Sequence, residues 1–529
     1  MKIGHNMTTN IRNSLSNALY DSGVEVKNDA ASLQFFAHDI CDCGGELAAI
    51  ITPKNIDELA KAVKAAHNEG AYIVPRGGGM SYTGGYTPKA DGAVMVDLSQ
   101  MDRILEIDEE DMTVTVEAGC TWAILYEALK PLGLRTPFWG TLSGLKASIG
   151  GGMSQNAIFW GTGRYGSAVN SCISMQVVLA NGDILQTGNG KARPYGPDLT
   201  GIFLADTGAL AIKAAITLRL IKEAKAHGFA SFTFDHHHQF LAAMSDIIRA
   251  DISTECFGFD PRLNAIRMQR DSLSSDVKAL AGMMKAQKSI FGALKEGAKV
   301  IAAGRNFLKD AQFSMHVLAE GRIQAAADAD IAAARAIAQK YGGAEVENSI
   351  PKIIRANPFG PLNSILGPQG ERWLPIHGLL PHSRAKPCYD AIEEFFSQNS
   401  AEMEKFGIYY GTLIAAVGGI NGAGVVIEPC LYWPDERNPL IEKTVESDHL
   451  SKLPTWPHDD EIWNIVKKYK QAIIDIFAAH GASHFQIGRA YPYVKSLDAP
   501  ALALLQSIKQ HVDSHGKMNP GSLGLNDGK

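Results

Sequence analysis

The sequence predicts an α+β fold with more than one domain, and three observations support this. The chain has 529 residues, of which 46% are hydrophobic, enough to fill a large core. Over roughly the first 225 residues, short β-branched runs alternate with helical stripes, and a glycine-rich loop joins two of the runs. From about residue 226, longer helical stripes separate the strands, which is typical of a second layered unit.

The first 225 residues contain one clear amphipathic helix among several short strands. Residues 54–69 place apolar side chains at positions 56, 59, 60, 63 and 66 and end at Gly70, which predicts a helix. A β-branched run, an Asn-Gly turn and a second apolar run over 176–185 predict a hairpin. A leading helix is expected over 11–22 and another over 122–130; further strands are expected over 71–74, 94–98, 104–107, 113–117 and 215–220.

The later part of the chain predicts a separate α+β unit. Strands are expected over 229–234, 257–259, 409–415 and 425–432. Helices are expected over 238–250, 322–341 and 460–480. Long helices between strands suit a sheet with one face covered by helices.

The most informative local feature is the glycine-rich loop at 77–85, which packs five glycines into nine positions. Without a Cβ, consecutive backbone N–H groups can turn toward one anion such as a phosphate pair. The loop matches neither the dinucleotide fingerprint, which opens a helix, nor the P-loop, which ends in Gly-Lys-Ser/Thr. Instead it joins strand to strand, and on its own it is also compatible with plain turn chemistry.

Two further segments change that interpretation. Residues 147–157 read Ala-Ser-Ile-Gly-Gly-Gly-Met-Ser-Gln-Asn-Ala, and residues 195–220 run from a Tyr-Gly-Pro-Asp turn into a strand. In this order and spacing, the three segments resemble the FAD-binding domain of the vanillyl-alcohol oxidase/p-cresol methylhydroxylase (PCMH) family. Within that family the flavin domain is most like those of glycolate oxidase and D-lactate dehydrogenase subunits. The resemblance covers roughly residues 45–225, with a closing Asn-Pro-Gly motif at 519–521.

The resemblance implies a domain organisation and a cofactor. It implies an N-terminal extension over 1–44, a two-subdomain FAD-binding domain of PCMH type over 45–225, an α+β cap for substrate over 226–499 and a C-terminal return over 500–529. Many relatives tether FAD through a histidine in the first glycine loop; Met80 stands there, so non-covalent FAD is expected. The residues expected at FAD are Pro75, Arg76, Gly77, Gly78, Gly79, Met80, Ser81, Gly84, Gly85, Ser143, Ser148, Gly151, Gly152, Ser154, Gln155, Gly166, Ile212 and Asn519.

The resemblance implies an FAD-dependent oxidoreductase that oxidises an alcohol carbon by hydride transfer to flavin N5, with a D-2-hydroxy acid of lactate or glycolate type as the preferred substrate. His484 lies shortly before the closing motif, where relatives place residues beside the flavin, and is the preferred proton acceptor. Alternating spacing would put His484 and Gln486 on one face of an extended segment. Arg384 or Arg489 is expected to pair the substrate carboxylate through two parallel N–H bonds. His377 and Tyr410 complete the catalytic candidates, although a structural role for either histidine stays open.

The alternative substrate is an aromatic alcohol or alkylphenol, with Tyr409, Tyr410, Tyr491 or Tyr493 binding a phenolate. A non-catalytic flavin-binding protein is a third, less favoured reading. The region 418–428 lacks the histidines that metal-dependent hydroxy-acid members carry, so no metal is expected to assist the chemistry.

Composition limits the partners. A net charge of −6 argues against nucleic acid, and seven scattered cysteines with no paired framework suggest reduced thiols in a cytoplasmic protein. The segment 276–310 carries seven basic against three acidic residues with apolar residues interleaved. It reads as a basic helical insertion (271–310) packed on the cap or as a peripheral contact with the inner face of a membrane. The remaining expected partners are a small-molecule substrate and an electron acceptor (a quinone, a cytochrome or oxygen), with a homo-oligomer as an open alternative.

Overall fold

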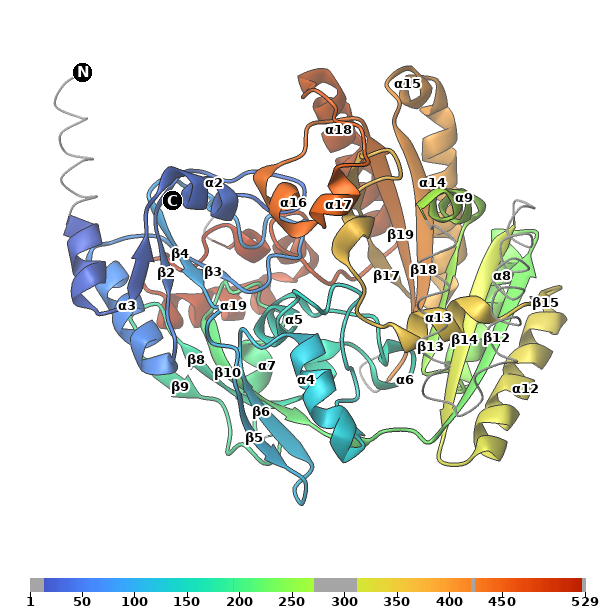
Figure 1. Ribbon diagram of the computed structural model, residues 1–529, viewed down its shortest axis with the longest axis horizontal. Helices are drawn as coiled ribbons and strands as arrows, with labels where there is room; N and C mark the ends of the chain where they lie inside the picture. Colours follow the sequence, from blue (N-terminus) through green and yellow to red (C-terminus); the bar gives the residue numbers. More distant parts are fainter. Residues whose placement is uncertain (1–13, 194, 271–311, 420–423, 526–529) are drawn as a thin grey trace.

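The computed structural model describes residues 14–193, 195–270, 312–419 and 424–525. The predicted basic insertion 271–310, and the membrane contact proposed for it, lie outside these residues. Within them, two smaller sheets form one half of the molecule and an eight-stranded sheet forms the other half, called the cap below (Figure 1). The predicted α+β class is therefore confirmed.

The first sheet has the strand order β1-β2-β4-β3, with β1 antiparallel to β2 and the other pairs parallel. The predicted amphipathic helix is α3 (Ile56–Asn68), whose N-cap Asn55 accepts a hydrogen bond from the Glu58 N–H. Residues 25–27 pair with β2, so part of the segment expected as an extension lies in this sheet. The strands are β1 (Glu25–Lys27), β2 (Leu47–Thr52), β3 (Ile73–Arg76) and β4 (Ala93–Asp97).

The second sheet is fully antiparallel, with the order β5-β6-β10-β8-β9. The predicted Asn-Gly hairpin joins β8 to β9, with Gly182 at φ +87° as its turn requires. A two-stranded ribbon of β7 and β11 lies beside it. The strands are β5 (Ile104–Asp108), β6 (Thr113–Glu117), β7 (Leu134–Arg135), β8 (Cys172–Val178), β9 (Ile184–Gln186), β10 (Ile212–Arg219) and β11 (Ile221–Lys222).

The cap sheet is antiparallel, with the order β15-β12-β14-β13-β18-β19-β16 and β17 also paired to β19. Its strands are β12 (Ala226–Phe234), β13 (Glu255–Phe259), β14 (Phe313–Gly321), β15 (Ala344–Val346), β16 (Arg372–Pro375), β17 (Gly378–Leu380), β18 (Tyr409–Val417) and β19 (Gly424–Trp433).

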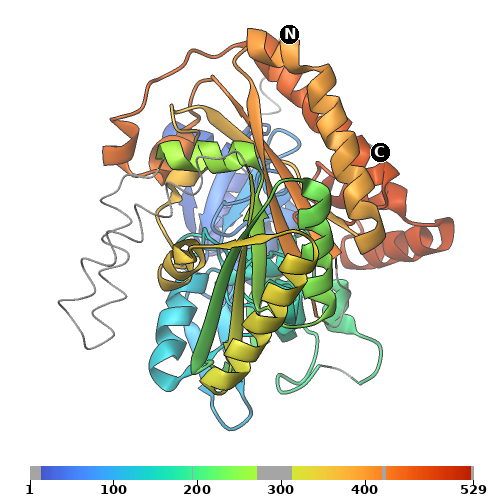
Figure 2. The same cartoon turned by 90° about the vertical axis from the view of Figure 1, so that its right-hand side faces the viewer.

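One face of the cap sheet is covered by α8 (His237–Arg249), α12 (Gln324–Lys340) and α14 (His382–Gln398), with α18 (Asp460–Ala479) packed on α14 (Figure 2). The other face turns toward the two smaller sheets (Figure 1). Because side chains alternate along a strand, Tyr410 points to the helical face while its neighbour Tyr409 points to the inner face.

The remaining helices are short or flank the sheets. Residues 14–21 are helical, and the C-terminal α19 (Ala499–Val512) returns to the first half, where the Lys509 ammonium donates to the Ala209 carbonyl at 2.6 Å. The other helices are α2 (Ala30–Ala37), α4 (Trp122–Leu129), α5 (Ile149–Gln155), α6 (Thr162–Tyr165), α7 (Leu199–Ile202), α9 (Pro261–Arg270), α13 (Ser349–Ala356), α15 (Ser400–Lys405), α16 (Pro439–Thr444) and α17 (Ser447–Leu450). Short 3-10 turns lie at Lys130–Leu132, Ala168–Ser171, Leu362–Ile365, Tyr493–Ser496 and Ser522–Gly524.

Across the described ranges, none of the helices combines the length and the apolar character needed to span a bilayer.

Candidate functional site

The first glycine loop follows β3 and packs directly against the second glycine segment. A Cβ on Gly77 would lie 2.2 Å from the Ser148 hydroxyl oxygen. A Cβ on Gly78 would lie 1.8 Å from the Lys146 carbonyl oxygen. Both distances are far inside van der Waals contact, so this close approach of two loops requires glycine at both positions.

Two buried side chains hold the loop in shape. The Asp39 carboxylate accepts a hydrogen bond from the Gly84 N–H at 2.8 Å. The Tyr86 hydroxyl lies 2.7 Å from the Gly79 carbonyl oxygen and 3.0 Å from that of Ser81. These bonds engage the Gly79 and Ser81 carbonyl oxygens and hold the backbone of the loop in place.

The N–H groups in the first part of this loop have no hydrogen-bond partners among the described residues. None of the five backbone N–H groups from Gly77 to Ser81 meets a hydrogen-bond acceptor in the described parts of the chain. By contrast, the Gly151 N–H at the start of α5 is already bonded to the Ser148 hydroxyl at 3.2 Å. Five adjacent donors without acceptors form a site that suits a phosphate-bearing ligand.

A cavity opens in front of these donors, with about 830 Å³ of space outside protein atoms, part of it open to solvent. Two of its lining side chains, Gln155 and Trp122, carry a buried polar atom without a hydrogen-bond partner in the described residues. The predicted residues that line it are Pro75, Arg76, Gly77, Gly78, Gly79, Met80, Ser81, Gly85, Ser143, Ser148, Gly151, Gly152, Ser154, Gln155 and Ile212.

Three predicted residues lie outside the lining. Gly84 and Asn519 stand directly behind it, where the Asn519 amide donates to the carbonyls of Gly85 and Thr207 at 2.8 Å each. Gly166 ends α6, where a Cβ would meet the Asn170 side chain. It does not line the cavity. Asn519 thereby ties the C-terminal turn to the glycine loop.

The far wall of the cavity is closed by a buried ion pair. Lys213 lines the cavity, and its ammonium bonds the Asp206 carboxylate. Asp206 also accepts the N–H groups of Gly208 at 2.9 Å and Leu210 at 3.2 Å. Both partners are almost fully buried, so we assign Lys213 a structural role in this wall.

None of the five predicted catalytic residues lines the cavity, and three of them are held elsewhere in the structure. The Arg489 guanidinium is held by the Thr87 and Pro520 carbonyls and the Asn519 side chain, so it clamps two loops together instead of facing a substrate. Arg384 is exposed near the start of α14, on the outer face of the cap. The Tyr410 hydroxyl donates to Glu393 at 3.1 Å on that same outer face. None of these three side chains lines the cavity, and a contact with substrate stays a prediction for them.

The two predicted histidines lie together at the border between the halves. His377 is fully buried, its Nε2–H donates to the Phe485 carbonyl at 2.6 Å, and burial lowers its pKa to about 3. The His484 Nδ1–H donates to the His377 carbonyl at 2.8 Å, and burial lowers its pKa too. The His484 ring stacks on Tyr491 with 4.1 Å between ring centroids. Neither histidine is among the cavity-lining residues.

A turn separates His484 from the cavity and brings Gln486 to it. Gln486 has φ +46° and Gly488 φ +55°, so the segment bends and the predicted extended face shared by His484 and Gln486 does not form. Gln486 lines the cavity, and its amide donates to the Tyr82 hydroxyl at 3.1 Å. Tyr82 thus lies one hydrogen bond behind the cavity wall.

Tyr82 belongs to a buried group that we call the tyrosine–glutamate cluster: Tyr82, His377, Glu428 and Tyr491. The Tyr491 hydroxyl accepts the His377 backbone N–H at 2.9 Å and lies 3.3 Å from its Nδ1. A Glu428 carboxylate oxygen lies 3.9 Å from the same Nδ1. Burial raises the pKa of Glu428 to about 8, and burial followed by the Glu428 charge raises that of Tyr82. Of these four groups, only Glu428 has its pKa shifted toward neutral pH, so it is the group that can take up or release a proton there.

Sequence reasoning missed Tyr82, Gln486 and Glu428 as site residues. The available signal for Glu428 was a lone carboxylate within the apolar run of β19, a residue type that is rarely buried without a role. On the same face of the cap sheet, an apolar cluster surrounds this region with Phe257, Phe259, Tyr432 and Phe485. The site therefore combines a cavity lined by the glycine loops in the first half with an aromatic border from the cap.

Comparisons with known proteins agree with this arrangement. Residues 47–188 match the family model described as FAD binding domain. The chain is 34% identical over 206 residues to glycolate oxidase subunit GlcD of Bacillus subtilis, covering 39% of this chain and 43% of that protein. It is 36% identical over 174 residues to the mitochondrial D-lactate dehydrogenase [cytochrome] of Arabidopsis thaliana, covering 33% of this chain and 30% of that protein. The chain thus spans less than half the length of these relatives.

Solved structures share the fold over nearly the whole chain. The substrate-bound structure of p-cresol methylhydroxylase aligns with a TM-score of 0.69 at 16% identity, covering 98% of this chain and 97% of that one. An alkyldihydroxyacetonephosphate synthase aligns with a TM-score of 0.67 at 14% identity, covering 94% and 82%. The predicted flavoprotein resemblance and the PCMH-type fold are confirmed, with residues 47–188 similar to the FAD binding domain.

Proposed function

We propose that this chain is an FAD-dependent oxidoreductase that oxidises an alcohol carbon by hydride transfer to flavin N5. The observation that carries the proposal is a cavity with five unpartnered backbone N–H groups on one side and a buried carboxyl and two tyrosines behind its other wall. Bound FAD would supply the hydride-accepting N5 atom. The protein's own residues would bind the cofactor, orient the substrate and accept its hydroxyl proton.

The glycine loop is the part of the cavity suited to the FAD pyrophosphate. Its N–H groups from Gly77 to Ser81 are free to donate, and the unpartnered polar atoms of Gln155 and Trp122 offer further contacts. We expect non-covalent FAD because methionine at position 80 offers no attachment chemistry. Acid precipitation should release all flavin into the supernatant; flavin retained in the pellet would refute non-covalent binding.

Two groups are candidates for the proton acceptor. Glu428 is favoured because its raised pKa of about 8 makes its ionised form a stronger base than an ordinary carboxylate. His484 remains the second candidate, since its Nδ1–H is fixed by the His377 carbonyl and its other nitrogen keeps a lone pair. The hydroxyls of Tyr82 and Tyr491 would position the substrate oxygen between them.

The substrate class is proposed as a D-2-hydroxy acid, supported by the relatives named glycolate oxidase and D-lactate dehydrogenase. An aromatic alcohol or alkylphenol is the second candidate. The aromatic border around Tyr432 and the commitment of Arg489 to protein oxygens favour it.

An anaerobic flavin-bleaching screen with D-lactate, glycolate and D-2-hydroxyglutarate beside vanillyl alcohol and 4-cresol separates these classes. Bleaching by one set identifies the class. Flavin that no donor bleaches would instead indicate a non-catalytic flavin-binding protein.

A small-molecule substrate and an electron acceptor suit such an enzyme, and the acceptor is proposed to be a quinone, a cytochrome or oxygen. A cytoplasmic location, a homo-oligomer and a peripheral membrane contact through 276–310 remain proposals. Re-oxidation of the reduced enzyme by each acceptor in stopped flow ranks the acceptors, and vesicle flotation with anionic lipid tests the membrane contact.

A further inference from the structure

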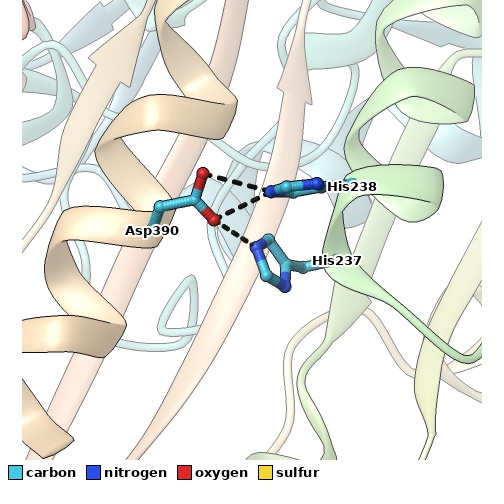
Figure 3. A group of neighbouring side chains, drawn as sticks. All are labelled: His237, His238 and Asp390. Atoms are coloured by element: carbon cyan, nitrogen blue, oxygen red, sulfur yellow. Dashed lines mark hydrogen bonds and ion pairs between the residues drawn. The ribbon is translucent and has the colours of Figure 1, made fainter.

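On the outer face of the cap, far along the sheet from the cavity wall, two adjacent histidines meet one carboxylate. His237 and His238 begin α8, and Asp390 lies on α14, which packs beside α8 (Figure 3). The His237 Nε2 lies 2.6 Å and the His238 Nε2 2.8 Å from the same Asp390 oxygen, and the second carboxylate oxygen lies 3.1 Å from His238. Three ligand-type groups from two helices thus converge on one point.

The spacing suits a divalent transition metal. Ligand atoms of the three side chains all lie within 4.8 Å of one another. A tetrahedral zinc ion with bonds of about 2.0–2.1 Å separates neighbouring ligand atoms by about 3.4 Å. The carboxylate would therefore need to withdraw by less than about 1 Å to admit the ion, with solvent completing the coordination.

The surroundings hold one of the three groups in place for this role. The His237 ring stacks on the buried Tyr389 with 4.7 Å between centroids and 28° between planes. An ionised carboxylate beside imidazole nitrogens is a donor set that zinc, copper and nickel accept.

A second cluster of possible metal ligands consists of Glu223, His227 and Glu320. Its carboxylates are already paired with arginine side chains, so we propose no metal site there. Arg135 and Arg355 bond the Glu223 carboxylate at 3.1 and 2.7 Å, and Arg135 also pairs Glu320. A metal ion there would compete with two guanidinium groups, whereas no cation within the described residues pairs Asp390 apart from the two imidazoles.

We infer that His237, His238 and Asp390 form a binding site for a divalent transition metal ion, with zinc the first candidate, that links α8 to α14. The site is separate from the proposed flavin chemistry, since none of its residues lines the cavity. Its role is structural, because the ion would join two helices 152 residues apart at His238 and Asp390.

The test uses the full-length, tag-free flavoprotein stripped of metal with a chelator and titrated with Zn²⁺ against a chromophoric competitor. We expect one zinc per chain with micromolar or tighter affinity, falling at least tenfold in His237→Ala and in Asp390→Asn. The matched control is His236→Ala, which removes an exposed neighbouring histidine at the helix N-cap and should bind as the wild type does.

Cobalt substitution gives a second readout, since d–d absorption distinguishes four-coordinate from six-coordinate ions. Intense bands in the wild type that vanish in Asp390→Asn support the site. Equal loss of affinity in His236→Ala would show chelation by the histidine run alone, and wild-type affinity no better than that of Asp390→Asn would show no site; either result overturns the inference. Unchanged flavin content and melting of the metal-free variants exclude misfolding as the cause.

Discussion

Replacing Glu428 by glutamine preserves the size of the side chain and removes a carboxyl that titrates near neutral pH. With a pKa of about 8, about a tenth of these groups are ionised at pH 7 and about nine-tenths at pH 9. If the ionised form accepts the substrate proton, the rate of flavin reduction in the wild type rises about tenfold over that interval. The glutamine variant should reduce its flavin about 10²–10⁴-fold more slowly, the usual contribution of a positioned general base.

The assay is anaerobic stopped-flow reduction at saturating substrate, with flavin content measured on the same samples. Glu428→Gln should keep its flavin, because the glycine loop is untouched. The matched control is Glu393→Gln, which removes a carboxylate bonded to Tyr410 on the opposite face of the sheet and should leave the reduction rate unchanged.

A Glu428→Gln enzyme with the wild-type rate and the wild-type pH profile would refute the assignment. His484→Ala then becomes the deciding variant. If His484 is the acceptor, that variant keeps its flavin, loses about 10²–10⁴-fold in reduction rate and recovers part of it at high pH. If it loses flavin or fails to fold while its rate per flavin stays normal, His484 is structural.

Three further predictions concern cofactor retention and stability. Gly78→Ala should abolish flavin binding or folding, since its Cβ would lie 1.8 Å from a carbonyl oxygen, whereas Gly196→Ala, with open space around it, should purify with full flavin content. Lys509→Met should lower the free energy of unfolding by about 3–5 kcal/mol in urea titrations, because it leaves the Asp513 carboxylate buried without its ammonium; a loss below about 1 kcal/mol would contradict this. Asp246 has a pKa of about 2, below its usual 3.8, so its stabilising effect is present above about pH 4 and is lost as pH falls toward 2. The melting temperature of Asp246→Asn should therefore lie below the wild type at pH 6 and converge with it at pH 2; a constant gap would contradict the assignment.

The fold class, most element positions and the glycine-lined cavity could be predicted from the sequence. The helix Ile56–Asn68 follows from a periodic stripe with a cap, and the Asn-Gly hairpin from a two-residue turn. The glycine run at 77–79 is also visible in the sequence, but the close approach to Lys146 and Ser148 that requires it is a tertiary contact. The periodic stripe, the turn and the glycine run depend on neighbours in the chain, so they can be recognised from the sequence alone.

The arrangement of the catalytic candidates depended on tertiary structure. Gln486, not His484, reaches the cavity because a positive φ at residue 486 bends a segment that alternation alone would have kept straight. The Arg489 guanidinium donates its hydrogen bonds to the carbonyls of Thr87 and Pro520, which are far from it in the sequence. Glu428 meets His377 only because β16 and β17, which flank His377, both pair with β19. Residue type and spacing determine which backbone can form, but which side chains face each other across two domains is set by strand register and packing, which no local pattern encodes.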